Sequence, residues 1–333
     1  MWEEYHRDIP LEELVNNESY WEHEDKAIAT RSISGTILNK LKEDYPQLIG
    51  GSADLAPSTK TEMVNEGSFQ KESYEGRNIH FGVREHAMAG VGNGIVTHGG
   101  LKSYVSTFFV FTDFLKPALR LSALSQVPLI YIMTHDSIVV GEDGPTHQPI
   151  EQLATIRSQP NTQVFRPADY TETMASWALA LSDTRTPSVL VLSRQNLPNL
   201  KQSSKEALKG GYIISKEQGS DFDGILIASG SEVSLAIDAQ AELLKQGIDV
   251  RVVSMLSMEV FNAQDAAYRE SVLPNDKRKR LAIEAGASQP WFQYIGLDGK
   301  HITIDRFGHS APGEKVYEEY GFTVENVVKV YTE

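Results

Sequence analysis

The sequence predicts an α/β fold with two consecutive domains, each built on a largely parallel sheet flanked by helices. Short apolar segments alternate with helical patterns along most of the chain, as is typical of parallel sheets covered on both faces. A polar stretch interrupts this alternation after its first half. The length of 333 residues also favours two domains over one.

The interrupting stretch sets the expected domain boundaries. It runs from Asn196 to Lys209 and combines Pro198 with several serines, a composition typical of linkers. The first residues are acidic and aromatic with weak periodicity, which indicates a linker or arm. We expect an arm at 1–23, a first domain at 24–198, a linker at 199–210 and a second domain at 211–333.

The first domain begins with a helix from Thr30, because its apolar residues recur at helical spacing on one face. Strands are predicted where short apolar segments end in glycine or polar residues: 48–49, 78–83, 104–109, 127–133, 162–165 and 188–192. Helices are predicted between them at 87–96, 111–124 and 172–181. Pro117 must lie in the first turns of its helix or bend it.

The second domain repeats the alternation. An amphipathic helix at 233–244 ends near Gly247, as helices commonly do at glycine. Strands are predicted at 224–228, 249–255, 280–285 and 301–305. The first two of these strands and the helix between them predict a right-handed βαβ unit.

Composition excludes several classes of function. Asp and Glu number 45 against 31 Lys and Arg, and the net charge of -14 disfavours nucleic acid or an anionic membrane as a partner. The absence of cysteine excludes a disulfide framework and a thiolate nucleophile, and fits a cytoplasmic protein. Apolar segments are shorter than the roughly 20 residues of a membrane helix, and the charged N-terminus is unlike a signal peptide.

The segment from Gly141 to Pro149 is the first candidate site. It holds two acids, an imidazole and an amide, and it follows the strand predicted to run into His135. Ligands of open α/β sheets bind at the carboxyl ends of strands, so His135, Asp143 and His147 lie where reactive groups are usually presented. A surface loop with solvated charges is the alternative. The density of titratable groups favours a site.

Glu85 stands at the start of a predicted helix rich in small residues. Burial can raise a carboxyl pKa by about 3 to 5 units and let it share a proton with a ring nitrogen. It is equally explained as a first-turn acid stabilised by the helix dipole. Phe108, Phe111 and Phe114 recur every three residues, a spacing that suits core packing, the commoner role, or a clamp on a flat heterocycle.

Arg31 and Arg194, with His135 and Ser58, are natural phosphate ligands if the fold brings them together. The glycines at 90–94 lie within a predicted helix, so we interpret them as close packing and not as a phosphate loop. Neither the His-Glu-x-x-His motif of zinc enzymes nor the Gly-x-Ser-x-Gly motif of hydrolases is present, and we expect no metal ligands in this chain.

Four blocks of the sequence resemble the transketolase family, in the same order. They are Gly50-Gly51-Ser52-Ala53-Asp54-Leu55, Phe81-Gly82-Val83-Arg84-Glu85-His86-Ala87-Met88, Thr134-His135-Asp136-Ser137 with Gly141 to Pro149, and Leu192-Ser193-Arg194-Gln195. The resemblance covers nearly the whole chain but only the latter half of a full transketolase, its pyrimidine-binding and C-terminal domains. It therefore implies thiamin diphosphate as cofactor, bound here by the pyrimidine end only, with a Mg or Ca ion held by the missing domain.

The resemblance also implies a role for each candidate residue. Glu85 is expected to hydrogen-bond the thiamin aminopyrimidine, which Phe108, Phe111 and Phe114 cradle; the third of these positions is often Tyr in the family. Leu55 and Asp54 are expected near the cofactor. Sugar-phosphate contacts are implied for Arg31, Ser58, His135 and Arg194, a hydroxyl contact for Asp143, and hydrogen bonding or proton transfer at the donor carbonyl for His147. With Glu85 and His147, His135 is also expected among the catalytic residues.

The activity implied is transfer of a two-carbon ketol unit between ketose and aldose sugar phosphates. Because the diphosphate-binding domain is not matched, we expect weak cofactor binding and negligible turnover until a chain bearing that domain is added. Apolar surface that normally meets this domain favours a homodimer or higher assembly.

Three alternatives remain open at this point. The β subunit of a 2-oxoacid dehydrogenase has a similar size and also uses a Glu for thiamin activation, but its substrate carries no sugar phosphate. Deoxyxylulose-phosphate synthase shares a comparable Asp-Gly-Pro-Thr-His loop. A non-catalytic scaffold is the third, against which the retained Glu85, Asp143 and His147 count.

Overall fold

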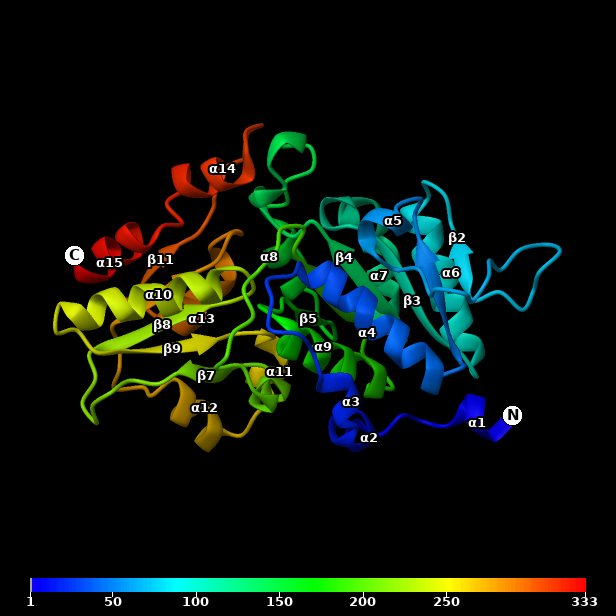
Figure 1. Cartoon of the computed structure of the whole chain (residues 1–333), viewed down its shortest axis with the longest axis horizontal. Coiled ribbons are helices and arrows are strands. Elements are labelled where there is room, and N and C mark those ends of the chain that lie inside the picture. Colours follow the sequence, from blue (N-terminus) through cyan, green and yellow to red (C-terminus); the bar gives the residue numbers. More distant parts are fainter. Residues whose placement is uncertain (1) are drawn as a thin grey trace.

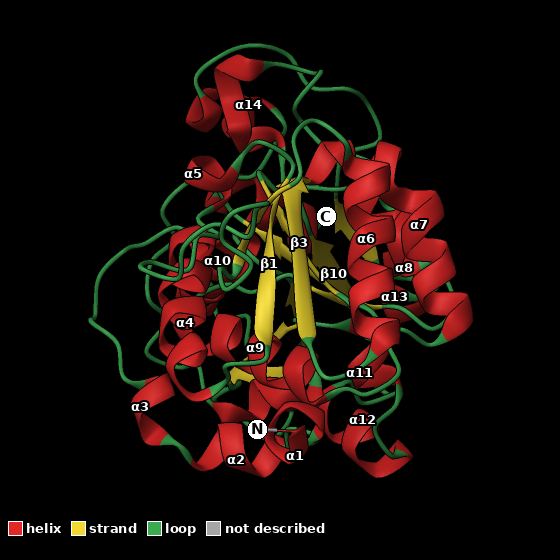
Figure 2. Ribbon diagram, turned by 90° about the vertical axis from the view of Figure 1, so that its right-hand side faces the viewer, coloured by secondary structure: helices red, strands yellow, loops and turns green. Residues whose placement is uncertain are grey.

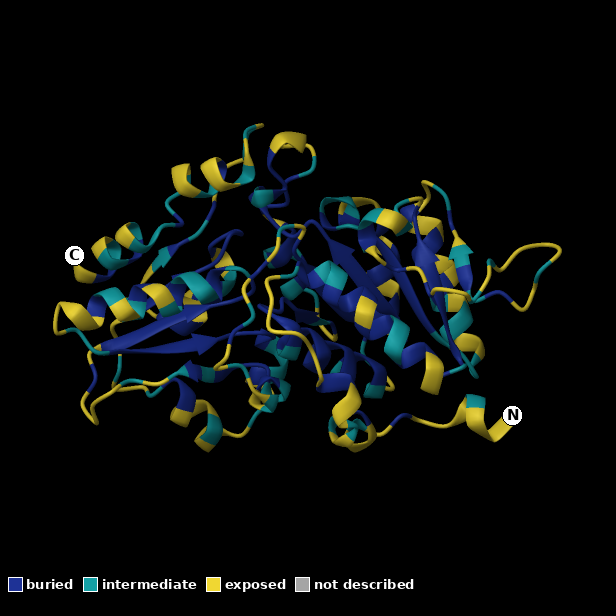
Figure 3. Cartoon of the chain, in the orientation of Figure 1, coloured by how far each residue is buried: buried dark blue, intermediate teal, exposed yellow. Residues whose placement is uncertain are grey.

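The structure, a computed structural model, describes residues 2–333 as two α/β domains side by side (Figure 1). The strands of both sheets are buried, whereas exposed residues lie on the outer turns of helices and on loops (Figure 3). The largest apolar cluster runs through both domains and includes Trp177 of the first and Leu256 of the second.

The first sheet has six strands in the order β2-β1-β3-β4-β6-β5, and every neighbouring pair is parallel. The strands are β1 (Leu48–Ser52), β2 (Asn78–His80), β3 (Lys102–Phe108), β4 (Ile130–Thr134), β5 (Gln163–Phe165) and β6 (Ser188–Leu192). Each predicted strand of this domain is present, although β2 is shorter than the segment 78–83. The parallel sheet predicted from the alternation of elements is therefore confirmed.

Helices cover both faces of this sheet, as expected. Figure 2 shows β1 and β3 between α4 on one side and α6 with α7 on the other. The main helices are α4 (Thr30–Asp44), α6 (Glu85–His98), α7 (Thr112–Ser125), α8 (Gln152–Arg157) and α9 (Tyr170–Ser182), with shorter α5 (Ala56–Thr59), η1 (Phe109–Phe111) and η2 (Ile138–Asp143). The predicted apolar face of α4 is buried, and Pro117 lies in the second turn of α7.

The glycines of α6 show why small residues suit this helix. A Cβ on Gly92 would meet Leu129 and Val105 at 2.9 Å, so the helix packs tightly on the sheet at that point. Gly90 and Gly94 have open space around them. The segment belongs to a helix interior and close packing explains only Gly92.

The N-terminal residues, which we expected to form a linker or arm, include α1 (Trp2–His6), α2 (Leu11–Asn16) and α3 (Glu18–Trp21). Leu14, Tyr20 and Trp21 are buried in the core of the first domain. The indole of Trp21 donates to the carbonyl of Leu14 at 3.1 Å, and Tyr170 of α9 donates to the carbonyl of Tyr20 at 2.9 Å. A few large side chains thus pack this segment against the domain.

The second sheet has five strands in the order β11-β10-β8-β9-β7. They are β7 (Tyr212–Ser215), β8 (Gly224–Ala228), β9 (Val250–Ser254), β10 (Arg280–Ile283) and β11 (Lys300–Ile302). All pairs are parallel except that β7 runs antiparallel to β9 at the sheet edge. Sequence patterns predicted the four parallel strands and missed β7.

Helices complete the second domain. They are α10 (Glu232–Lys245), α11 (Met258–Asn262), α12 (Ala266–Val272), α13 (Phe292–Ile295), α14 (Gly313–Glu319) and α15 (Val324–Thr332), with short turns η3 (Lys205–Lys209) and η4 (Gln289–Trp291). The predicted helix at 233–244 corresponds to α10. No helix among residues 2–333 has the length and apolar character needed to span a membrane.

Candidate active site

The candidate residues gather at the carboxyl edge of the first sheet. Phe108 at the end of β3 pairs with Thr134 at the end of β4, and Thr134 pairs with Leu192 at the end of β6. His135 and Arg194 follow these strand ends directly, and Asp54 follows β1. Parallel register therefore delivers residues distant in sequence to one edge, where such sheets bind ligands.

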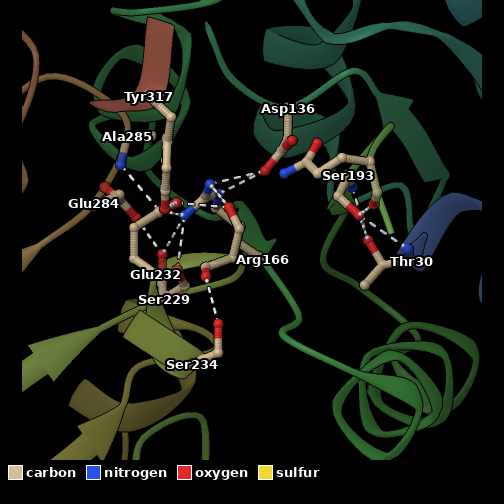
Figure 4. Close-up of polar contacts among 12 residues, drawn as sticks. Thr30, Asp136, Arg166, Ser193, Ser229, Glu232, Ser234, Glu284, Ala285 and Tyr317 are labelled. Carbon is tan, nitrogen blue, oxygen red and sulfur yellow. Dashed lines mark hydrogen bonds and ion pairs between the residues drawn. The ribbon is translucent and has the colours of Figure 1, made fainter. Parts of the chain in front are cut away.

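The two arginines converge because the start of α4 is fastened to the end of β6. The hydroxyl of Ser193 accepts hydrogen bonds from the Thr30 amide at 3.0 Å and the Thr30 hydroxyl at 3.1 Å. The Thr30 hydroxyl in turn accepts from the Ser193 amide at 2.7 Å. This reciprocal contact, drawn in Figure 4, holds the neighbouring residues Arg31 and Arg194 on the same side of the sheet edge.

Arg31 contacts two other residues that were expected to bind phosphate, Ser58 and His135. Its Nη1 donates to the carbonyl of Ser58 at 2.8 Å and lies 3.4 Å from Nε2 of His135. Burial and then the charge of Arg194 lower the pKa of Arg31, which shows that the two guanidiniums are close enough to repel. Among residues 2–333, no acid forms an ion pair with Arg31 or Arg194, so these two neighbouring cations form a site suited to an anion.

His135 is held in a strained and buried position. Its backbone φ is 65°, in the left-handed region that non-glycine residues rarely adopt and that is common at functional sites. Burial, followed by Arg31, Arg194 and His147, lowers the pKa of His135 to about 3. The imidazole is therefore neutral near pH 7. Its Nδ1 lies 2.8 Å from the Thr134 hydroxyl, and its Nε2 faces Arg31.

An aromatic group adjoins this anion site. The ring of His135 packs on Phe108 at 3.7 Å between centroids, and Phe108 stacks on Phe111 at 6.0 Å with 10° between planes. Phe111 is 6.1 Å from Phe114, and His147 meets Phe111 edge-on at 5.5 Å. Phe114 is 62% exposed. The three phenylalanines are thus a connected group, exposed at Phe114.

Glu85 is the first residue of α6 and is 8% exposed. Helices α6 and α7 start at the same edge of the sheet and are joined by Asn93, whose amide donates to the Ala118 carbonyl at 3.0 Å. Within residues 2–333, no side chain or amide donates to the Glu85 carboxylate. A largely buried carboxylate without a protein donor can pair with a ligand nitrogen, which fits the pyrimidine end of thiamin diphosphate.

Three expected site residues are not joined to these groups. Asp54 is exposed and has a φ of 62°, and Leu55 is half-buried at the start of α5. Asp143 is exposed at the end of η2. In the described chain, neither acid forms a hydrogen bond or ion pair with the two arginines.

A buried ion network that was not predicted from the sequence begins at Asp136, next to His135. Asp136 accepts hydrogen bonds from Nε and Nη2 of Arg166 at 3.1 and 2.8 Å. The same guanidinium donates to the Ser229 carbonyl at 2.8 Å and to Glu232, both in the second domain (Figure 4). Arg166 directly follows β5, and this strand-end position was the available signal. The network connects the site to the second domain.

Comparison with known proteins identifies related families for both domains. Residues 26–199 match the model of the transketolase pyrimidine-binding domain, and residues 210–323 match the transketolase-like C-terminal domain. The transketolase of Bacillus subtilis is 55% identical over 306 residues, which are 91% of this chain and 46% of that protein. The chain therefore spans about half the length of the curated relatives it matches.

Solved structures agree with this relationship. A Pichia stipitis transketolase in complex with sedoheptulose 7-phosphate has a TM-score of 0.88 and 41% identity, over 99% of this chain and 48% of that one. A split-gene transketolase described as an inactive beta4 tetramer has a TM-score of 0.74 and 25% identity. That chain is covered over 97% of its length, and this one over 92%.

Proposed function

This chain belongs to the transketolase family, and on that premise we propose that it is half of a thiamin-diphosphate-dependent enzyme that transfers a two-carbon ketol unit between sugar phosphates. The observation that carries the proposal is the group formed by Arg31, Arg194 and the neutral His135 beside the phenylalanines. The sugar phosphate named for the Pichia stipitis structure supports the same class of substrate.

Arg31, Arg194 and His135, which we call the anion group, are proposed to hold the substrate phosphate. Two guanidiniums bind a phosphate dianion through directed hydrogen bonds, and a neutral imidazole adds a donor without the cost of a third buried cation. The phosphate lies away from the bond that breaks, so its binding energy serves to orient the sugar. This use of local cations is compatible with the acidic composition of the chain.

Thiamin diphosphate, when bound, supplies the electron sink for breaking the carbon–carbon bond. The Glu85 carboxylate is proposed to hold a proton against a ring nitrogen of its pyrimidine, which Phe108, Phe111 and Phe114 contact. Leu55 and Asp54 are proposed to line the same region. His147, beside the phenylalanines, is proposed to exchange a proton at the carbonyl oxygen of the donor sugar, and Asp143 to accept from a sugar hydroxyl.

A second chain or domain is proposed to supply the diphosphate and Mg or Ca ligands, because this chain spans 46% of the Bacillus subtilis enzyme. We further propose self-association through the outer face of α6 and α7. This face carries Val91, Phe114, Leu121 and Leu124, which are 48%, 62%, 54% and 67% exposed. The split-gene relative, described as a tetramer of one subunit type, is a precedent.

Reconstitution tests the function. The purified chain is mixed with the diphosphate-binding half of a transketolase, thiamin diphosphate and Mg, and ketol transfer from xylulose 5-phosphate is followed. We expect activity with the mixture and none with either half alone. Glu85→Ala should lower kcat by at least about a hundredfold, since activation of the cofactor depends on it. Glu325→Gln, another first-turn helix acid, is the control.

Two results would contradict the proposal. One is tight, metal-dependent binding of thiamin diphosphate to the chain alone by calorimetry. The other is equal activity of the reconstituted wild type and Glu85→Ala, which would leave the scaffold alternative.

A further inference from the structure

The loop with Asp143 and His147 is held in place by the second domain. This site loop, residues 138–149, contains η2 and two glycines with positive φ, Gly141 at 79° and Gly144 at 75°. Within it, the Gly144 amide donates to the Gly141 carbonyl and the His147 amide to the Gly144 carbonyl, both at 3.0 Å. Contacts from outside the loop add to these bonds.

Those contacts come from residues 308–313, which we call the clamp segment. The Ser310 hydroxyl donates to the Glu142 carbonyl at 2.6 Å. Gln148 is 2% exposed, and its side-chain Nε2 donates to the carbonyls of Ile138, Gly141 and His309 at 3.2, 2.9 and 3.1 Å. Gln148 thus joins Ile138 and Gly141 of η2 to the backbone of His309 in the clamp segment.

Close backbone packing reinforces these bonds. A Cβ on Gly141 would lie 2.9 Å from the Gly313 amide nitrogen, and a Cβ on Gly313 would lie 2.5 Å from the Val139 carbonyl. A Cβ on Gly308 would lie 1.9 Å from the Gln148 side-chain oxygen. Figure 1 shows α14, which begins at Gly313, beside the loop that follows β4. Glycine is needed on both sides of this contact.

We propose that the clamp segment of the second domain sets the position of Asp143 and His147, and that Ser310 and Gln148 are positioning residues for the donor sugar. Neither contacts the anion group, and each acts through the backbone of the site loop. The second domain would thereby contribute to substrate recognition without lining the substrate site. This role rests on the proposed function for its catalytic consequence, whereas the clamp itself can be tested independently.

Hydrogen exchange of the purified chain tests the clamp. Ser310→Ala removes the hydroxyl bond to the site loop, and its control Ser271→Ala removes a hydroxyl bond of the same 2.6 Å length to the Tyr268 carbonyl. Amides of 138–147 should exchange about fivefold faster in Ser310→Ala than in the control, the change expected for one typical hydrogen bond. Equal rates would overturn the clamp.

A glycine pair gives a second, independent comparison. Gly313→Ala and Gly94→Ala both replace glycines that do not have a positive φ. Only the Ala at 313 would meet the site loop, at 2.5 Å from the Val139 carbonyl, since Gly94 has nothing within 4 Å of its Cβ position. Faster exchange of 138–147 is expected for Gly313→Ala alone. Unchanged exchange in a folded Gly313→Ala protein would contradict the clamp.

The positioning role is tested in the reconstituted enzyme. Ser310→Ala should raise KM for the ketose donor several-fold with an unchanged melting temperature, and Ser310→Thr should restore it. Faster exchange with an unchanged KM would overturn the positioning role and leave the clamp as a structural contact. If the wild-type mixture lacks ketol transfer, the proposed function fails, while the exchange experiment still decides whether the clamp exists.

Discussion

Arg31 and Arg194 lie close together in the structure, although their positions in the sequence do not predict this. Both were identified from sequence as candidate phosphate ligands, but neither pattern nor spacing indicates that they lie together. The reciprocal bonds between Thr30 and Ser193 bring them together, and hydroxyl pairs of this kind have no sequence signature. The neutral state of His135 was equally hidden, because it arises from burial and from both arginines.

Glu172 of α9 is a second residue whose chemistry comes from burial. Burial, followed by Asp169, raises the pKa of Glu172 to about 7. Its Oε1 accepts from the hydroxyls of Tyr212 and Ser254 in the second domain, at 3.0 and 2.6 Å. The folded chain therefore retains a proton here that the unfolded chain loses near pH 4.5.

The free energy of unfolding should consequently fall as pH rises from about 4.5 to about 7, by up to roughly 1.4 kcal/mol per pH unit from this group, and then level off. Glu172→Gln should flatten this dependence because glutamine does not ionise. Urea unfolding at pH 5, 6, 7 and 8 measures it, with exposed Glu325→Gln as control. A Glu172→Gln slope equal to that of wild type would exclude a protonated Glu172.

At the scale of elements, the sequence predicted the helices and strands whose apolar residues recur at a clear spacing. It identified the six strands of the first sheet and the helices α4, α6, α7 and α9, but not the short helices α5 and α8. It missed β7, a four-residue edge strand whose antiparallel pairing with β9 depends on a partner distant in sequence. The N-terminal segment lacks periodicity, yet Tyr20 and Trp21 are buried, and Tyr20 also bonds to Tyr170, which is distant in sequence.

Strand β1 offers a test of close packing between elements. A Cβ on Gly51 would lie 1.8 Å from the Ile79 carbonyl of β2, so Gly51→Ala must displace one of the two strands. We expect a loss of at least about 1–3 kcal/mol in the free energy of unfolding. Gly94→Ala in α6, with open space around it, should instead gain roughly 0.5–1 kcal/mol. Unfolding in guanidinium chloride measures the free energy of unfolding of both variants. An equal loss in Gly51→Ala and Gly94→Ala would refute the packing argument.

At the scale of the whole molecule, the outer face of α6 and α7 predicts assembly. Leu121→Asp with Leu124→Asp places two charges on this apolar face and should shift the chain from an oligomer toward the monomer. Leu297→Asp is the control, because Leu297 is 99% exposed in the second domain. Sedimentation velocity at micromolar concentration measures the change. An oligomer unaffected by the double substitution would place the interface elsewhere.

The ion network of Arg166 has a consequence for dissecting this chain. Its guanidinium has no exposed surface and is shared between Asp136 of the first domain and Glu232 of the second. We expect a polypeptide cut between residues 199 and 210 to stay associated, because the network lies beside the apolar cluster shared by both domains, which separation would expose to water. A protease-nicked sample should therefore still elute as one particle. On that outcome, the two sheets would belong to one folding unit.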